Sequence, residues 1–208
     1  MKRDKGMLAE LVVVVAIFLF VGCGQRQEGA KVHPADDFPE MMAQAKSGDA
    51  LSAYNVAVRY LTGDGVVRNE RAGFEWMSRA ACGGEPNAQF NLGVMYASGD
   101  SVPQSVTNAV KWYRLAAEKG VAEAQFNLAL ILYQGQGVRR NRDEAAKWFR
   151  LAAEAGNGRA QYFAGDCCYV GFGGPKDREA AISWYRKSAA QGVGSAKGRL
   201  KELGVGEK

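Results

Sequence analysis

Residues 109–120, AVKWYRLAAEKG, and residues 145–156, AAKWFRLAAEAG, are nearly the same stretch and lie 36 residues apart. They agree at nine of twelve positions. The same interval separates all four tryptophans of the chain, Trp76, Trp112, Trp148 and Trp184. It also separates two rows of glycines, which are Gly63, Gly99, Gly135 and Gly171, and Gly84, Gly120, Gly156 and Gly192. A repeat period between about 20 and 50 residues indicates a solenoid of stacked units.

Each unit carries the signals of two helices. Residues 122–133, AEAQFNLALILY, place apolar side chains on one helical stripe and lack the alternation of a strand. A glycine-rich turn follows, and then short polar residues that can cap a second helix, namely Asn69, Ser105, Asn141 and Asp177. The second helix ends at the second row of glycines, where a left-handed conformation suits glycine. We expect the tryptophans of the second helices to be wedges in the core.

A helix pair of this size cannot bury its apolar face alone, so successive units must stack. One position of the first helix is always small, as Ala57, Gly93, Ala129 and Gly165, which predicts a close approach of the paired helices. The fold predicted is therefore all-α: a right-handed α/α superhelical solenoid of four 36-residue helix-turn-helix repeats with terminal capping helices.

The same alignment predicts the organisation of the whole chain. The predicted parts are a signal peptide at 1–22, a lipidated Cys23 with a flexible tether at 23–37, an N-terminal capping helix at 38–48, repeats at 49–84, 85–120, 121–156 and 157–192, and a C-terminal capping helix and tail at 193–208.

Residues 87–120, NAQFNLGVMYASGDSVPQSVTNAVKWYRLAAEKG, resemble the Sel-one-like repeat (SLR), a relative of the tetratricopeptide repeat. The matching elements are AxAQFNLG, the GxGV turn and AxxWxxxAAxxG, and they recur in four units. Leu132 and Cys168 depart from the pattern, because they replace the tyrosine found at Tyr60 and Tyr96. The resemblance implies an adaptor that binds other proteins, as such repeats do in bacterial envelopes, secretion, signalling and host contact.

The first 24 residues, MKRDKGMLAELVVVVAIFLFVGCG, have a basic start and an apolar run over residues 11–21. The run is shorter than the roughly 20 residues that a membrane span needs, and its length is typical of a secretory signal peptide. The sequence LFVGC resembles a bacterial lipobox, which implies cleavage before Cys23 and attachment of palmitate and other lipid there. Ordinary secretion and an uncleaved anchor remain open, since Phe20 and Glu10 are unusual. The expected location is the cell envelope, lipid-anchored to an outer membrane facing the periplasm or to the cell surface.

The residue inventory argues against catalysis. The single histidine, His33, lies in the tether, which removes Ser-His-Asp and Cys-His arrangements and histidine-based zinc sites. The glycine-rich turns lack the Lys and Ser/Thr of a phosphate-binding loop. A formal charge of +5 is too weak and too scattered to favour nucleic acid. We therefore predict no enzyme activity, no cofactor, no metal and no nucleic-acid partner, and we expect Cys82, Cys167 and Cys168 to be small buried thiols.

The function predicted is a non-catalytic scaffold that binds a protein or peptide in the concave face of the solenoid. An envelope signalling or stress adaptor and a binder or inhibitor of cell-wall enzymes remain open alternatives. By similarity to the tetratricopeptide arrangement, Asn55, Asn91 and Asn127 face the inner surface, where an amide can pair with an extended backbone. The alternative is that these amides bond to neighbouring helices. Phe163 occupies the fourth position of the row and predicts an apolar pocket there.

Overall fold

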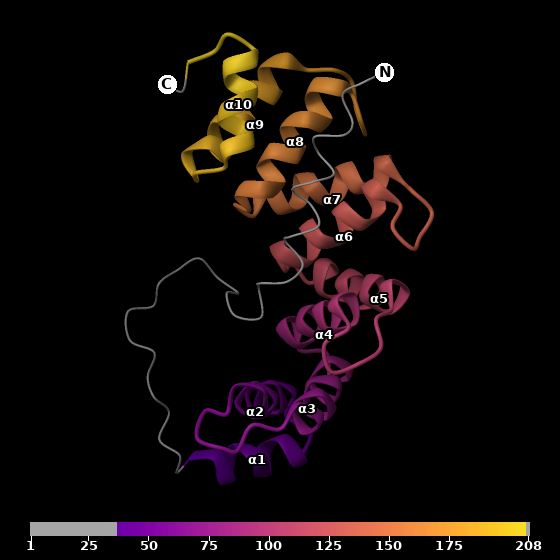
Figure 1. Cartoon of the computed structure of the whole chain (residues 1–208), viewed down its shortest axis with the longest axis vertical. Coiled ribbons are helices and arrows are strands. Elements are labelled where there is room, and N and C mark those ends of the chain that lie inside the picture. Colours follow the sequence, from indigo (N-terminus) through magenta and orange to yellow (C-terminus); the bar gives the residue numbers. More distant parts are fainter. Residues whose placement is uncertain (1–36, 207–208) are drawn as a thin grey trace.

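The computed structural model describes residues 37–206 of the 208-residue chain. Helices follow one another along its long axis from α1 to α10, and this part of the chain contains no strand (Figure 1). The helices are α1 (Phe38–Lys46), α2 (Ala50–Thr62), α3 (Glu70–Cys82), α4 (Pro86–Ser98), α5 (Val106–Glu118), α6 (Ala122–Gln134), α7 (Arg142–Glu154), α8 (Gly158–Val170), α9 (Arg178–Ala190) and α10 (Gly194–Glu202). The predicted signal peptide and Cys23 lie outside the described residues.

Four helix pairs, α2 with α3, α4 with α5, α6 with α7 and α8 with α9, form four successive units. The second helix of each unit also packs against the first helix of the next, while α1 packs against α2 and α10 against α9. This arrangement confirms the predicted all-α solenoid, in which each unit contacts its neighbours.

The helix ends follow the repeat. Asn69, Ser105, Asn141 and Asp177 each accept a hydrogen bond from the backbone N–H three residues on, as predicted for N-caps. The first helices end at Gly63, Gly99, Gly135 and Gly171, all with a left-handed φ. Such a φ strains any residue with a Cβ, so these glycines mark where the chain must turn.

The close approach of the paired helices is confirmed at the two glycines of the small-residue row. A Cβ added at Gly93 would lie 2.7 Å from Cδ1 of Tyr113, and one added at Gly165 would lie 2.6 Å from Cε1 of Tyr185. Real Cβ atoms do not come this close to a ring, so a larger residue would push the paired helices apart. The aromatic ring of the second helix thus fills the space that glycine leaves in the first.

The prediction that the tryptophans are core wedges holds only in part, because all four pack against the core but do not fill it. All four are only partly buried, whereas the residue after each is almost fully buried, as Met77, Tyr113, Phe149 and Tyr185. At this partly exposed position, cations approach the rings of Trp76, Trp112 and Trp184. The guanidinium of Arg79 is 4.6 Å from the ring of Trp76, and the ammonium of Lys187 is 4.5 Å from that of Trp184.

The cysteines also differ from the expectation of three buried thiols. Cys167 is buried, but Cys168 is half-buried and Cys82 is exposed. Cys82 is the last residue of α3, one position beyond the buried pair Ala80 and Ala81, so its side chain leaves the stacking face.

An ion pair between a buried arginine and a more exposed aspartate joins α1 to the first unit. Arg59 of α2 is 4% exposed, and its Nη2 lies 2.7 Å from Oδ1 of Asp37. The equivalent positions in the next units hold Met95, Ile131 and Cys167, so an arginine is not needed for stacking. Its guanidinium also lies 5.9 Å from the ring of Phe38, which fixes α1 against the end of the solenoid.

Candidate functional site

The asparagine row, defined as Asn55, Asn91 and Asn127, lies on α2, α4 and α6 at equal positions of three successive units. All three side chains are half-buried. The next positions of the same register are Phe163 on α8 and Arg199 on α10, so the row continues as an aromatic and then a basic side chain.

Two of the asparagines contact tyrosines of the neighbouring helices. Nδ2 of Asn91 donates to the hydroxyl of Tyr54 at 3.4 Å, across the interface between two units. Asn127 hydrogen-bonds to the hydroxyl of Tyr113, which partly offsets the rise in the pKa of Tyr113 that burial causes. These contacts are of the kind that the structural alternative predicts. An amide carries two N–H donors and one acceptor, and half-exposure leaves Asn91 and Asn127 accessible from solvent as well.

A pocket of about 120 Å³ lies at Phe163. Tyr133, Phe163, Val170 and Phe172 supply its apolar walls, and Phe163 stacks flat on Phe149 with ring centroids 4.7 Å apart. We expected an apolar pocket at this position. Two charged residues that we did not expect, Asp166 and Arg199, also line it.

These two belong to a polar cluster between the fourth unit and α10, defined as Tyr162, Asp166, Tyr185 and Arg199. The hydroxyl of Tyr185 donates to Oδ1 of Asp166 at 2.6 Å, and Nε of Arg199 lies 3.4 Å from the same oxygen. Burial raises the pKa of Asp166, and the hydrogen bonds from the two tyrosines and the charge of Arg199 offset only part of that rise. The polar cluster therefore holds a carboxylate that its neighbours incompletely compensate.

The sequence does contain a signal for this cluster. Asp166 stands in register with Val58, Val94 and Leu130, so it breaks an apolar row in the fourth unit only. A polar residue that interrupts a repeated apolar position is a candidate for function, because burying a charge costs free energy that stacking does not require.

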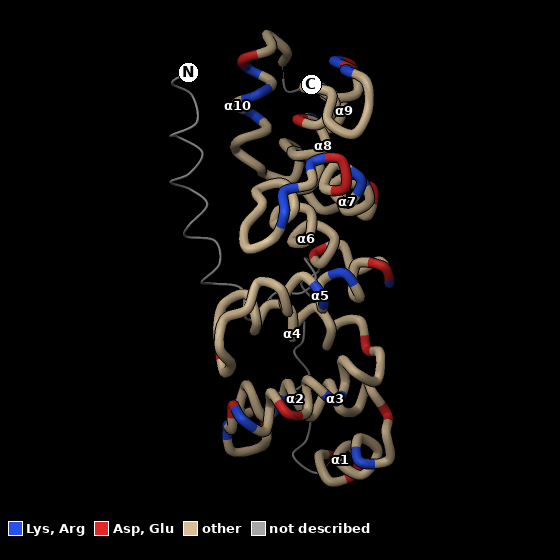
Figure 2. Tube along the Cα trace, turned by 90° about the vertical axis from the view of Figure 1, so that its right-hand side faces the viewer, with Lys and Arg blue, Asp and Glu red and all other residues tan. Residues whose placement is uncertain are grey.

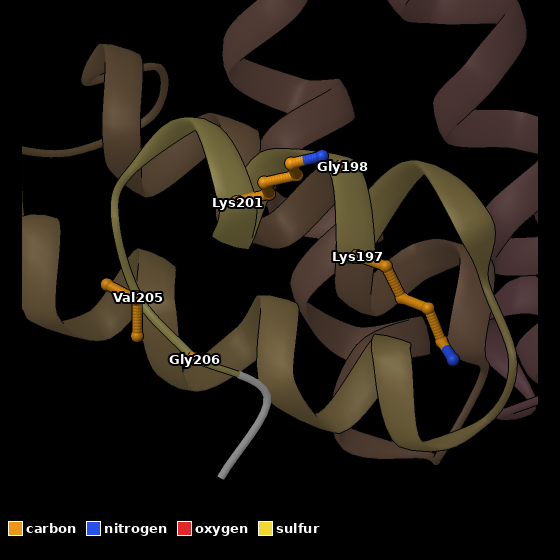
Figure 3. A pocket seen from close by; sticks show the side chains of 5 residues that line it. All are labelled: Lys197, Gly198, Lys201, Val205 and Gly206. Atoms are coloured by element: carbon orange, nitrogen blue, oxygen red, sulfur yellow. The ribbon is translucent and has the colours of Figure 1, made fainter.

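A larger pocket, of about 360 Å³, lies at the end of the solenoid and is lined by Lys197, Gly198, Lys201, Val205 and Gly206. Figure 3 shows the two lysine side chains on α10, with Val205 and Gly206 on the segment that follows. Lys201 stands in register with Gly93 and Gly165, the positions that pack against the second helix of their own unit. This pocket thus lies on the face of α10 that packs against a second helix in the other units.

Charges of both signs are interspersed over the described tube (Figure 2). Arg139 and Arg140 lie in the turn before α7 and Arg142 begins that helix. The guanidinium of Arg142 lies 5.5 Å from the ring of Tyr133 and 4.9 Å from that of Phe172. Within residues 37–206 no group of three or more His, Cys, Asp and Glu side chains is placed to hold a metal ion. None of the helices in the same range is long and apolar enough to cross a membrane.

The fold and the repeated register define a helical-repeat solenoid of the kind that binds other proteins. The Sel1 repeat model matches residues 50–85, 86–121, 122–157 and 158–193, so the chain belongs to the Sel1 repeat family. Sel1 repeat proteins generally mediate protein–protein interaction.

Two solved structures are similar over most of the chain. A protective antigen of uropathogenic Escherichia coli strains, which displays an SLR fold, is 35% identical with a TM-score of 0.73, and the match covers 81% of this chain and 37% of that protein. A Sel1 repeat protein from Oxalobacter formigenes is 29% identical with a TM-score of 0.75, over 82% of this chain and 49% of that one. The chain thus spans less than half the length of either protein. A comparison with curated proteins found no match.

Proposed function

We propose that this protein is a non-catalytic scaffold of a bacterial cell envelope that binds a protein or peptide partner along the asparagine row. The observation that carries the proposal is the placement of Asn91 and Asn127. They are half-buried amides at equal positions of two successive units, and the row leads to the pocket at Phe163.

The chemistry of the row suits an extended partner. A side-chain amide can donate to a backbone C=O and accept from a backbone N–H at the same time. Because the units repeat, a partner segment that runs along the row meets the same group on each unit. The fourth position offers an aromatic pocket instead, which suits one anchoring side chain.

The double substitution Asn91→Ala and Asn127→Ala is expected to abolish most partner capture from an envelope extract. It is also expected to lower the free energy of unfolding by about 1 kcal/mol at each site, since Tyr54 and Tyr113 lose a hydrogen-bond partner. The measurement compares the proteins enriched by the original chain and by the variant, together with thermal melting.

The matched control is Tyr54→Phe, which removes the tyrosine hydroxyl that Asn91 contacts but keeps the amide. This variant should lower the free energy of unfolding by about the 1 kcal/mol expected for the Asn91 site and should still capture the partner. If Tyr54→Phe loses capture as fully as the asparagine variants do, the row stabilises the stack and does not recognise a backbone.

The envelope part of the proposal rests on LFVGC and Cys23, which lie outside the residues that the structure describes. In cells grown with labelled palmitate, Cys23→Ser is expected to remove the label from this protein and to leave the uncleaved precursor. Cys82→Ser is the control, because Cys82 is an exposed thiol within the solenoid and should not affect labelling. Label that persists in Cys23→Ser, or a mature chain that lacks Cys23, would show that the anchor is wrong.

A further inference from the structure

We propose that the pocket at Phe163 receives a basic side chain, lysine or arginine, of the bound partner, with the carboxylate of Asp166 as its counter-charge. This inference rests on the proposed function and names the chemistry of one anchor within it. The pocket continues the asparagine row, since Phe163 occupies the position of Asn127 one unit further on.

The first argument is the charge balance around Asp166. Its side chain is 20% exposed, and Nε of Arg199 lies 3.4 Å from its Oδ1. Arg199 is shared, because its Nη1 lies 3.1 Å from Oε2 of Glu202. Two carboxylates therefore share one guanidinium, and the less exposed of them, Asp166, has the longer contact. A second cation at the pocket would balance the part of the negative charge of Asp166 that Tyr162, Tyr185 and Arg199 leave uncompensated.

The second argument is the wall of the pocket. Tyr133 and Phe172 line it, and both rings already have the guanidinium of Arg142 within 6 Å. The contact with Arg142 shows that these aromatic walls accommodate a guanidinium. The apolar surface of Phe163 and Val170 suits the aliphatic stem of a lysine or arginine, which packs on apolar groups while its charged end reaches a polar partner.

Arg142 and Arg199 would repel an incoming cation, and their effect has to be weighed. Arg142 is exposed, so water and salt screen its charge. Arg199 is about one-third exposed on its side chain, whereas that of Asp166 is only one-fifth exposed. Water therefore screens the attraction between Asp166 and an incoming cation less than it screens the repulsion from Arg142 and Arg199. An acidic side chain in the same place would meet this carboxylate directly, which argues against an anionic anchor.

The test uses the full-length chain labelled with ¹⁵N in detergent, titrated with N-acetyl-arginine methylamide. The expected result is a saturable shift of the backbone amide signals of Phe163, Asp166 and Phe172. N-acetyl-citrulline methylamide, which has nearly the same shape without the charge, should bind at least about ten-fold more weakly. N-acetyl-glutamate methylamide tests the anionic alternative, and preferential binding of it at these residues would overturn the proposal.

Asp166→Asn is expected to weaken binding of the arginine compound at least about ten-fold. Asp100→Asn, in an exposed turn of the second unit, should leave it unchanged. Arg199→Gln should strengthen binding of the arginine compound, because it removes the cation that now competes for the carboxylate of Asp166. The amide signals of α8 and α10 show whether each variant keeps its fold. If Arg199→Gln loosens α10, Glu202→Gln replaces it in the test. This variant leaves Arg199 to Asp166 alone, so binding of the arginine compound should not become stronger.

Equal binding of the arginine and citrulline compounds, or undiminished binding to a folded Asp166→Asn, would overturn the inference. The proposed function fails differently, through partner capture that does not depend on Asn91 and Asn127. A chain that captures its partner through the row but does not bind the arginine compound would refute the basic anchor alone.

Discussion

Replacement of Phe149 by alanine is expected to lower the free energy of unfolding by about 3–5 kcal/mol, the range for a fully buried phenylalanine. Phe149 is 0% exposed and stacks on Phe163 of the next unit at 4.7 Å. Its ring also lies 5.9 Å from that of Phe126 within its own unit. The cavity would thus weaken both the pairing of α6 with α7 and the stacking of the third unit on the fourth.

The matched variant is Trp148→Ala, one position earlier on the same helix. It removes a larger side chain but should cost only about 1–2 kcal/mol, because Trp148 is partly buried and loses less apolar area. Urea unfolding followed by far-ultraviolet circular dichroism measures both. A Trp148→Ala variant less stable than Phe149→Ala would restore the tryptophans as the wedges of the core and contradict the packing described above.

Removal of residues 194–208 is expected to destabilise the fourth unit by about 3–5 kcal/mol while leaving the first two units nearly unaffected. The truncation takes away Leu200, which is 0% exposed, and uncovers Tyr185 and Ala189 of α9. It also removes Arg199, the ionic partner of Asp166. An uncovered apolar face and a less compensated carboxylate both favour fraying of α8 and α9.

Hydrogen exchange resolved by helix is the measurement, because a solenoid loses stability locally. Amides of α8 and α9 should lose protection, and those of α2 to α5 should keep it. A chain that ends at Gly206 is the control and should behave like the original. Uniform loss of protection along the whole chain would indicate one cooperative domain, and unchanged exchange in α8 and α9 would show that α10 does not cap the stack.

The sequence alone determined the period, the helix pairs, the capping residues and the glycine turns. These features follow from repetition, because every copy meets the same neighbours and must meet the same local demands. Asn141 caps α7 for the reason that Asn69 caps α3, and Gly165 is small for the reason that Gly93 is small. A pattern that recurs four times averages out the ambiguity of any single helix.

Only the tertiary structure decided which aromatic residue fills the core and which residues of other helices surround Asp166. Trp148 and Phe149 are adjacent, and the difference of about 100° in direction around a helix puts one at the edge and the other in the interior. Asp166, Tyr185 and Arg199 come from α8, α9 and α10, and their meeting depends on the stacking of the last unit against α10. Periodicity cannot reveal such contacts, because they occur once, at the end of the array, where the environment of a residue no longer repeats.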